Sequence, residues 1–210
     1  MLEEIKRKKI IDGDIIEIEI KNFGYVYAKY INVLRIYPET SYPDLLRIYQ
    51  KIYSKPITNL TSLDRELLIA PLAIAGIKGI FNILKCKIIG NEEVVIEEET
   101  LPDVKRGHPA FVGGYDDTQY DKWMVLKKLG DPTKFLLTKL ENVKHLEWAG
   151  ATNIEVLIFR IKLELFKLQG KDIKKEIGLK DWLEEEFYNR AINLPIYSKL
   201  DKSTRDFVII

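Results

Sequence analysis

One glycine-rich stretch, GHPAFVGGYDD from Gly107 to Asp117, brings together the residue types best suited to chemistry. It joins the imidazole of His108, three glycines and two adjacent carboxylates. An imidazole with a nearby carboxylate can act as a general base or hold a substrate. A surface loop explains the same residues, because Gly and Asp satisfy turn geometry. The paired glycines also lack the Lys-Ser/Thr of a phosphate loop and the third glycine of a dinucleotide fingerprint. The loop is therefore the simpler interpretation.

Other nucleophiles and metal ligands are sparse. The chain has two histidines, His108 and His145, and one cysteine, Cys86. Without a Cys cluster or a His-x-x-x-His spacing we expect no metal site, and a single cysteine excludes an intramolecular disulfide. Cys86 lies in an apolar run, which is typical of a buried structural thiol, and there is no Gly-x-Ser-x-Gly elbow. The sequence therefore predicts a protein that is not an enzyme and that needs no cofactor.

The acidic residues are unevenly distributed. Six carboxylates between Asn91 and Asp103 occur without one Lys or Arg, and Asp116 and Asp117 lie beyond them. Carboxylates at a strand edge could dock a basic protein surface, because complementary charge steers encounter. Alternatively they form a solvated strand face that prevents edge-to-edge aggregation. If the two groups share one face, Tyr115 could serve as an aromatic anchor. The predicted partner-binding residues are Glu97, Glu98, Glu99, Tyr115, Asp116 and Asp117.

Composition narrows the classes of partner. The formal net charge of the 210 residues is +1, which provides no basic field for nucleic acid. The basic clusters at 6–9 and 171–175 lack the interleaved aromatics of a nucleic-acid footprint. The apolar stretch ELLIAPLAIAGIKGIFNIL is interrupted by Pro71 and two glycines, so it does not predict a membrane span. We therefore expect a cytoplasmic protein that binds neither membrane nor nucleic acid.

Alternation at the N-terminus predicts a β-hairpin over residues 13–31. Ile16, Ile18 and Ile20 fall on one face, and the charged residues between them fall on the other. Asn22-Phe23-Gly24 supplies a turn. Such a hairpin is marginal alone, so it must open a larger sheet or barrel. The sequence predicts that one face of the hairpin is wet.

Further elements follow from the same patterns. A short helix is predicted to start at Tyr42-Pro43-Asp44, and strands at Cys86–Ile89, Val94–Ile96, Trp123–Val125 and Lys134–Leu137. A long helix is predicted between an Asn153 cap and a Gly170 stop, although FRIKLEL also alternates as a strand would. A final amphipathic helix is predicted to bury Trp182, Leu183, Phe187, Ala191 and Leu194.

These elements predict an α+β fold. We expect a strongly bent antiparallel sheet or a small open barrel, opened by the N-terminal hairpin, with C-terminal helices packed against it. Residues 1–150 should form a β-rich domain with a short helical insert. Residues 151–210 should form a C-terminal helical segment packed on the same core.

Three stretches occur in a suggestive order: GDIIEIEIKNFGYVYAKYI, then LLIAPLAIAGIKGI leading into LKCKIIGN, then HLEWAGATNIEVLIFRI. Over roughly residues 10–165 this order resembles the bacterial Immunity protein 26 family. The features that carry the resemblance are Gly13-Asp14, Tyr25 and Tyr27, Ile89-Gly90, and Trp148 with Ile154-Glu155. Cys86 stands where the family pattern has Trp, and residues 166–210 lie outside it. The resemblance implies a cytoplasmic antitoxin that binds one cognate polymorphic toxin and blocks it by occlusion, without catalytic residues.

Two other functions stay open at this point. A small-barrel module could bind nucleic acid or another ligand, with Tyr25 and Tyr27 as exposed stacking platforms. An enzyme could use the His108 loop. If the protein is an immunity protein, the helix from Trp182 to Arg190 is the second candidate for the toxin-binding surface, after the acidic residues.

Overall fold

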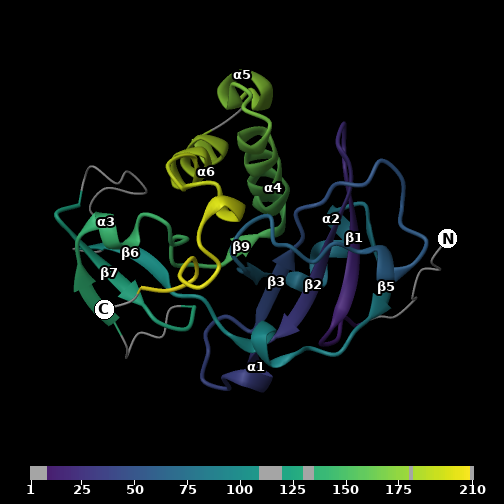
Figure 1. Cartoon of the computed structure of the whole chain (residues 1–210), viewed down its shortest axis with the longest axis horizontal. Helices are drawn as coiled ribbons and strands as arrows, with labels where there is room; N and C mark the ends of the chain where they lie inside the picture. Colours follow the sequence, from purple (N-terminus) through teal and green to yellow (C-terminus); the bar gives the residue numbers. More distant parts are fainter. Residues whose placement is uncertain (1–8, 109–119, 130–134, 180–181, 209–210) are drawn as a thin grey trace. The chain divides into compact units, whose positions relative to one another are not determined.

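The computed structural model describes residues 9–108, 120–129, 135–179 and 182–208 (Figure 1). The chain forms two compact units. The first unit consists of Met1–Thr100 and Ala151–Ile158, and the second of Leu101–Gly150 and Phe159–Ile210. The first unit contains a six-stranded sheet and the second a three-stranded sheet, and neither closes into a barrel within the described residues. The predicted α+β class is confirmed.

The sheet of the first unit has the strand order β5-β1-β2-β3-β4-β9. Neighbouring strands are antiparallel except β4 and β9, which are parallel. The strands are β1 (Asp14–Ile20), β2 (Gly24–Asn32), β3 (Asp44–Ile48), β4 (Leu72–Ala75), β5 (Cys86–Asn91) and β9 (Thr152–Asn153). The short helices are α1 (Val33–Ile36) and α2 (Ile80–Ile83), with 3-10 turns η1 (Leu60–Ser62), η2 (Ile77–Gly79) and η3 (Ile96–Glu99).

The predicted hairpin exists, but the face predicted to be wet is buried at Glu17 and Lys29 and exposed only toward the turn, at Glu19. β1 pairs with β2 through a turn in which Asn22 has φ 71° and Gly24 has φ 117°. A Cβ at Gly24 would lie 2.4 Å from the carbonyl oxygen of Tyr53, so only glycine fits there. Glu17 and Lys29, on the face predicted to be wet, are 5% and 2% exposed. That face is covered because the segments around residues 57 and 93–98 fold over it and hydrogen-bond to its side chains.

Two predicted elements are wrong. The segment predicted as a helix from Tyr42 contains strand β3, which lies between β2 and β4. A short apolar run is compatible with a helix or with a strand buried on both faces, and only the neighbouring strands decide between them. The strand predicted at Val94–Ile96 is absent, and η3 begins at Ile96 instead.

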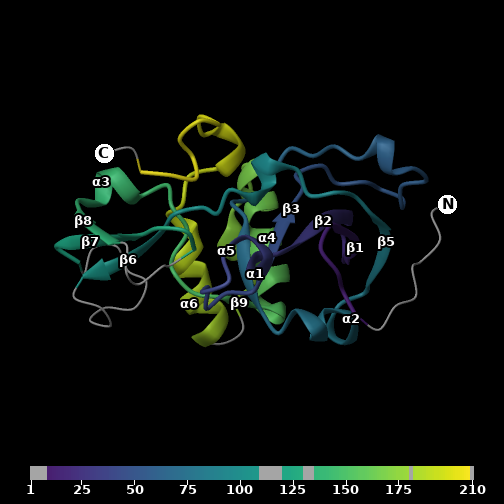
Figure 2. The same cartoon turned by 90° about the horizontal axis from the view of Figure 1, so that it is seen from below.

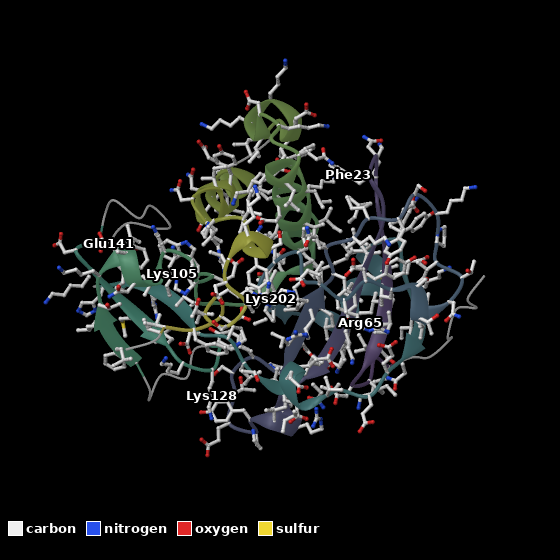
Figure 3. The ribbon with its side chains drawn as sticks, viewed as in Figure 1. Phe23, Arg65, Lys105, Lys128, Glu141 and Lys202 are labelled. Carbon is white, nitrogen blue, oxygen red and sulfur yellow. The ribbon has the colours of Figure 1, made fainter. Side chains whose placement is uncertain are left out.

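The second unit is built on the sheet β6-β7-β8, which is antiparallel throughout (Figure 2). Its core contains Trp123, Val125, Val143, Leu146, Trp148 and Val208. Lys105, labelled in Figure 3, is 1% exposed, and its Nζ lies 5.2 and 5.3 Å from the ring centroids of Trp123 and Trp148. The elements are β6 (Val104–His108), β7 (Lys122–Leu126), β8 (Phe135–Thr138), α3 (Leu140–Val143), α5 (Ile173–Ile177), α6 (Trp182–Ile192) and η5 (Tyr197–Lys199).

The long helix α4 (Ile154–Leu168) follows its local signals. The side chain of Asn153 accepts the Val156 N–H at 2.8 Å, and Gly170 has φ 65° just after the helix. The predicted cap and stop are thus confirmed, and the strand alternative is excluded. The inward face predicted for α6 is correct at Ala191 but wrong at Trp182, which is 73% exposed.

Candidate partner-binding site

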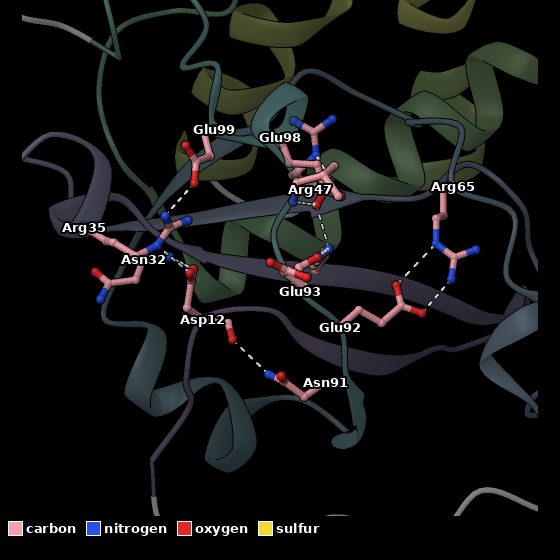
Figure 4. A network of polar contacts seen from close by, with 12 residues as sticks. Asp12, Asn32, Arg35, Arg47, Arg65, Asn91, Glu92, Glu93, Glu98 and Glu99 are labelled. Atoms are coloured by element: carbon pink, nitrogen blue, oxygen red, sulfur yellow. Dashed lines mark hydrogen bonds and ion pairs between the residues drawn. The ribbon is translucent and has the colours of Figure 1, made fainter.

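The acidic segment, which we define as residues 92–99, is attached to the six-stranded sheet by ion pairs (Figure 4). Glu98 is the main anchor: its Oε2 lies 2.6 Å from Lys29 Nζ and also accepts the Val95 N–H at 3.1 Å. Lys29 Nζ in addition donates to the carbonyl oxygen of Glu93 at 2.8 Å. Arg47 Nε lies 4.0 Å from Glu98 Oε1. One buried lysine of β2 therefore holds the segment at two points.

Two arginines hold the ends of the segment. Arg65 makes a bidentate contact with Glu92: Nη2 donates to Oε1 at 2.5 Å and Nε donates to Oε2 at 3.3 Å. Arg35 pairs with Glu99 at 2.5 Å and with Asp12 at 2.8 Å. The hydrogen bond to Glu99 raises the pKa of Arg35, so this guanidinium stays charged. Both contacts are partly exposed, and they orient the segment more than they stabilise the fold.

The Gly13-Asp14 pair positions the start of the segment. Gly13 has φ 84°, and a Cβ there would lie 2.1 Å from the carbonyl oxygen of Glu92. The Gly13 carbonyl accepts the Glu92 N–H at 3.0 Å. Asp14, fully buried, accepts from the Asn91 side-chain amide at 2.9 Å. Gly13-Asp14, one of the features that carry the family resemblance, thus has a structural role: it fixes the backbone where the acidic segment begins.

The carboxylates of the segment divide into two kinds. Glu98 and Glu99 form ion pairs, with Lys29 and Arg35 respectively, and their side chains are 13% and 30% exposed. Glu93 and Glu97 are exposed and form no ion pair with another described residue. Between them Val95 and Ile96 are 51% and 77% exposed. The exposed surface of the segment therefore has an apolar centre, Val95 and Ile96, flanked by the carboxylates of Glu93 and Glu97. Basic side chains of the first unit anchor the segment through the ion pairs described above.

Tyr27 lies in a second polar cluster under the first unit's surface, together with Glu17 and Lys87. Its hydroxyl donates to Glu17 Oε2 at 2.8 Å and accepts the Ile57 N–H at 2.9 Å. Lys87 Nζ lies 3.2 Å from Glu17 Oε1. Burial raises the pKa of Tyr27, so the hydroxyl stays protonated. Tyr27 is 0% exposed, so it cannot serve as one of the two stacking platforms named in the nucleic-acid interpretation, and the other, Tyr25, is half-buried.

Removing the Tyr27 hydroxyl should therefore destabilise the protein. We expect Tyr27→Phe to lower the free energy of unfolding by about 1–3 kcal/mol, because the buried Ile57 N–H loses its acceptor. Tyr53→Phe is the matched control, because its hydroxyl likewise donates one hydrogen bond (to the Ser62 carbonyl, 3.0 Å) and accepts one (from the Asp64 N–H, 2.9 Å), but both bonds are exposed. Urea unfolding of both variants gives the comparison. Equal losses would show that burial of the Tyr27 hydrogen bonds is unimportant.

The remaining predicted residues are placed as follows. Tyr115, Asp116 and Asp117 lie outside the described residues, so their share in the site stays a prediction. His108 is the last residue of β6, opposite Lys122. His145 Nε2 lies 3.1 Å from the carbonyl oxygen of Phe207.

The one cysteine, Cys86, is free and half-buried. Burial raises the pKa of the Cys86 thiol to about 12, so it is protonated at neutral pH and is a poor nucleophile. Across the described ranges, His, Cys, Asp and Glu side chains form no group of three that could hold a metal ion. Among the same residues, no helix has the length and apolar character needed to cross a bilayer.

The basic residues that pair with the acidic segment were not predicted from the sequence. Lys29, Arg35, Arg47 and Arg65 are scattered over the first part of the chain and form no cluster in the sequence. The one available signal was the position of Lys29, which shares a strand face with Tyr27 and, across the ladder, with Glu17. A lysine on a buried face needs a carboxylate partner, and residues 92–99 contain five carboxylates.

Comparison with known proteins gives one family match, and it covers this region. The model of the Immunity protein 26 family matches residues 11–111. Searches of curated proteins and of solved structures gave no significant match. The matched range contains the acidic segment and all of its described ion-pair partners. Over residues 11–111 the chain matches the Immunity protein 26 family, the family that its sequence resembles.

Proposed function

We propose that the chain is an immunity protein that binds one cognate polymorphic toxin and neutralises it by occlusion. The family match supports an immunity-type role. The acidic segment supports the choice of binding surface, because Ile96 is 77% exposed while Glu98 and Glu99, a few positions later, are held by ion pairs. The same proposal describes a cytoplasmic protein without catalytic residues.

The segment has the properties of a protein-binding surface. Interfaces combine an apolar centre with a polar rim, and a few central residues carry most of the binding energy. Val95 and Ile96 would form the centre, with Glu93 and Glu97 in the rim. A segment that is already ordered loses little conformational entropy on binding. Exposed carboxylates favour a partner with a basic surface, which speeds encounter at low salt.

The acidic residues would then have different roles. In this proposal Glu97 contacts the toxin directly, whereas Glu98 and Glu99 hold the segment in shape through Lys29 and Arg35. Tyr115, Asp116 and Asp117 are proposed as further partner residues from the sequence alone. A nucleic-acid function has no comparable support, since Tyr27 is buried.

The test uses a toxin encoded next to this protein's gene, which this proposal predicts. Ile96→Lys should raise the Kd for that toxin about 30-fold, the effect of losing a hot-spot residue, and should abolish protection of cells that express the toxin. Ile83→Lys is the matched control, because Ile83 is an exposed isoleucine of the same unit, 53% exposed on α2. Calorimetric titration and a growth assay measure the two effects.

Two failures are distinguishable. If the wild-type protein neither binds nor protects against that toxin, the function is wrong. If it protects and Ile96→Lys protects equally well, the function holds but the acidic segment is not the binding surface. Thermal midpoints of both lysine variants should equal that of the wild type, because both side chains are exposed.

A further inference from the structure

The sheet face beneath the acidic segment carries polar side chains at positions where a covered sheet face is normally apolar. Lys29 on β2 is directly opposite Arg47 on β3, and both side chains reach Glu98 of the acidic segment. Tyr49 follows Arg47 by two residues along the same extended chain, so its side chain points to the same face. Tyr49 is 1% exposed. Buried cations and hydroxyls are stable only when acceptors satisfy them, so this face needs acceptors.

The carboxylate of Glu98 serves this face with one oxygen far better than with the other. Its Oε2 accepts from Lys29 Nζ at 2.6 Å and from the Val95 N–H at 3.1 Å. Its Oε1 accepts no hydrogen bond from any residue that the structure describes, and Arg47 Nε lies 4.0 Å away from it (Figure 4). The carboxylate of Glu98 is therefore only half used.

Two donors on the same face have no acceptor within the described part of the chain. They are the Nε of Arg47 and the hydroxyl of Tyr49, and both atoms are buried. Burial raises the pKa of Tyr49 and the charge of Glu98 raises it further, so the hydroxyl is protonated and feels that carboxylate. Two donors without an acceptor thus occur around one carboxylate oxygen without a donor.

We propose that Lys29, Arg47 and Tyr49 form a binding site for one small carboxylate, and that Glu98 is its built-in ligand. A free monocarboxylate such as formate is not tied to the backbone. It can turn one oxygen to Lys29 and the other to Arg47 and Tyr49, since a carboxylate accepts about four hydrogen bonds.

The Glu98 side chain fills this site in the wild type and keeps free anions out. In Glu98→Ala the shielded charges of Lys29 and Arg47 lose their counter-charge, which favours entry of a small anion. A filled site also keeps Lys29 in place, so that its hydrogen bond to the Glu93 carbonyl oxygen continues to hold the acidic segment. The order of the acidic segment then depends on whether the site is filled.

Formate rescue of Glu98→Ala tests the site on the full chain. With about 200 mM sodium formate and a Kd of about 10 mM, the variant should unfold about 4 °C higher than in sodium chloride of equal concentration. Amide hydrogen exchange at residues 92–99 should become slower in formate. Adding Tyr49→Phe should raise the Kd for formate about tenfold, because one hydrogen bond to a charged group is lost.

Two further variants separate the site from a general salt effect. Glu98→Gln keeps the space filled, so formate should not stabilise it. Glu92→Ala removes a carboxylate of the same segment, but its partner Arg65 is 44% exposed and needs no replacement anion, so formate should not stabilise this variant either. Equal stabilisation of the three single variants, or none of Glu98→Ala, would overturn the proposal. If Glu98→Ala is unfolded in chloride, refolding in formate supports the site, and failure to refold in either salt overturns it.

Discussion

The Arg160→Met variant is expected to lose about 3–5 kcal/mol of unfolding free energy, because it leaves buried carboxylates without their partner. Arg160 lies in α4 and pairs with Glu147 at 2.8 Å and with Glu164 at 3.0 Å. Glu164 is fully buried and also accepts the Tyr197 N–H at 3.1 Å. Lys167, at 3.6 Å from Glu164, and Arg190, whose charge also lowers the pKa of Glu147, provide further positive charge nearby. One guanidinium thus neutralises two carboxylates inside the second unit.

The pH dependence of this loss has a definite sign. Burial by itself would raise the pKa of Glu147, but Arg160, by its charge and its hydrogen bond, together with the charges of Arg190 and Lys167, outweighs burial, so the net pKa is lowered. A carboxylate with a lowered folded pKa stabilises the protein above its ordinary pKa, and this stabilisation disappears as the pH falls through the folded value. Without Arg160 the main opposition to the burial effect is lost, and only the weaker contributions of Arg190 and Lys167 remain. The variant should therefore lose stability as the pH rises through that range, whereas the wild type gains it.

Urea unfolding at several pH values between 4 and 7 measures both effects. The difference between wild type and Arg160→Met should widen toward neutral pH. Lys162→Met is the control, since it removes a cation from the same helix at a position that is half-exposed, and its effect should stay within about 0.5 kcal/mol. A constant difference at all pH values would mean that packing, and not the charge of Glu147 and Glu164, accounts for the loss.

Lys29→Met should have the second-largest effect, in the first unit. The Lys29 side chain is 3% exposed and Glu98 is 13% exposed, so their 2.6 Å ion pair is mostly shielded from water. We expect a loss of about 2–3 kcal/mol, less than for a fully buried pair because Glu98 keeps contact with water and with Arg47. The acidic segment should also loosen, which faster amide hydrogen exchange at residues 92–99 would show.

A double-mutant cycle separates the ion pair from other effects of the substitution. Lys29→Met together with Glu98→Gln should lose less than the sum of the single variants, with a coupling of about 1–2 kcal/mol. Lys85→Met is the exposed counterpart, because Lys85 is 82% exposed and lies 3.7 Å from Glu19. Surface pairs of this kind contribute about 0–1 kcal/mol. Equal losses for Lys29→Met and Lys85→Met would show that the acidic segment is not held by Lys29.

The local features of the chain could be predicted from the sequence. The hairpin of β1 and β2 follows from alternation and a turn at Asn22–Gly24, and the start of α4 follows from the Asn153 cap. These features depend on residues within a few positions of one another, so their physical causes are visible in the sequence. The resemblance to the Immunity protein 26 family could likewise be found from short, ordered stretches.

Elements whose identity depends on their neighbours were harder to predict. The run at Leu45, Leu46 and Ile48 has the same composition as a buried helix turn, and it forms a strand because β2 and β4 pair with it. Trp182 was expected inside from helical spacing, yet it is exposed. Periodicity shows that a face is apolar, but not whether another element covers it.

The candidate site divides in the same way. The sequence alone determined that residues 92–99 are acidic and that Lys29 lies within a strand. Only the tertiary structure decided that Glu98 and Glu99 are paired while Glu93 and Glu97 face solvent. The reason is distance along the chain: Lys29 and Glu98 are 69 positions apart, and Arg35 and Glu99 are 64 apart. Ion pairs over such separations arise only after the sheet brings the partners together, because no local pattern links their charges.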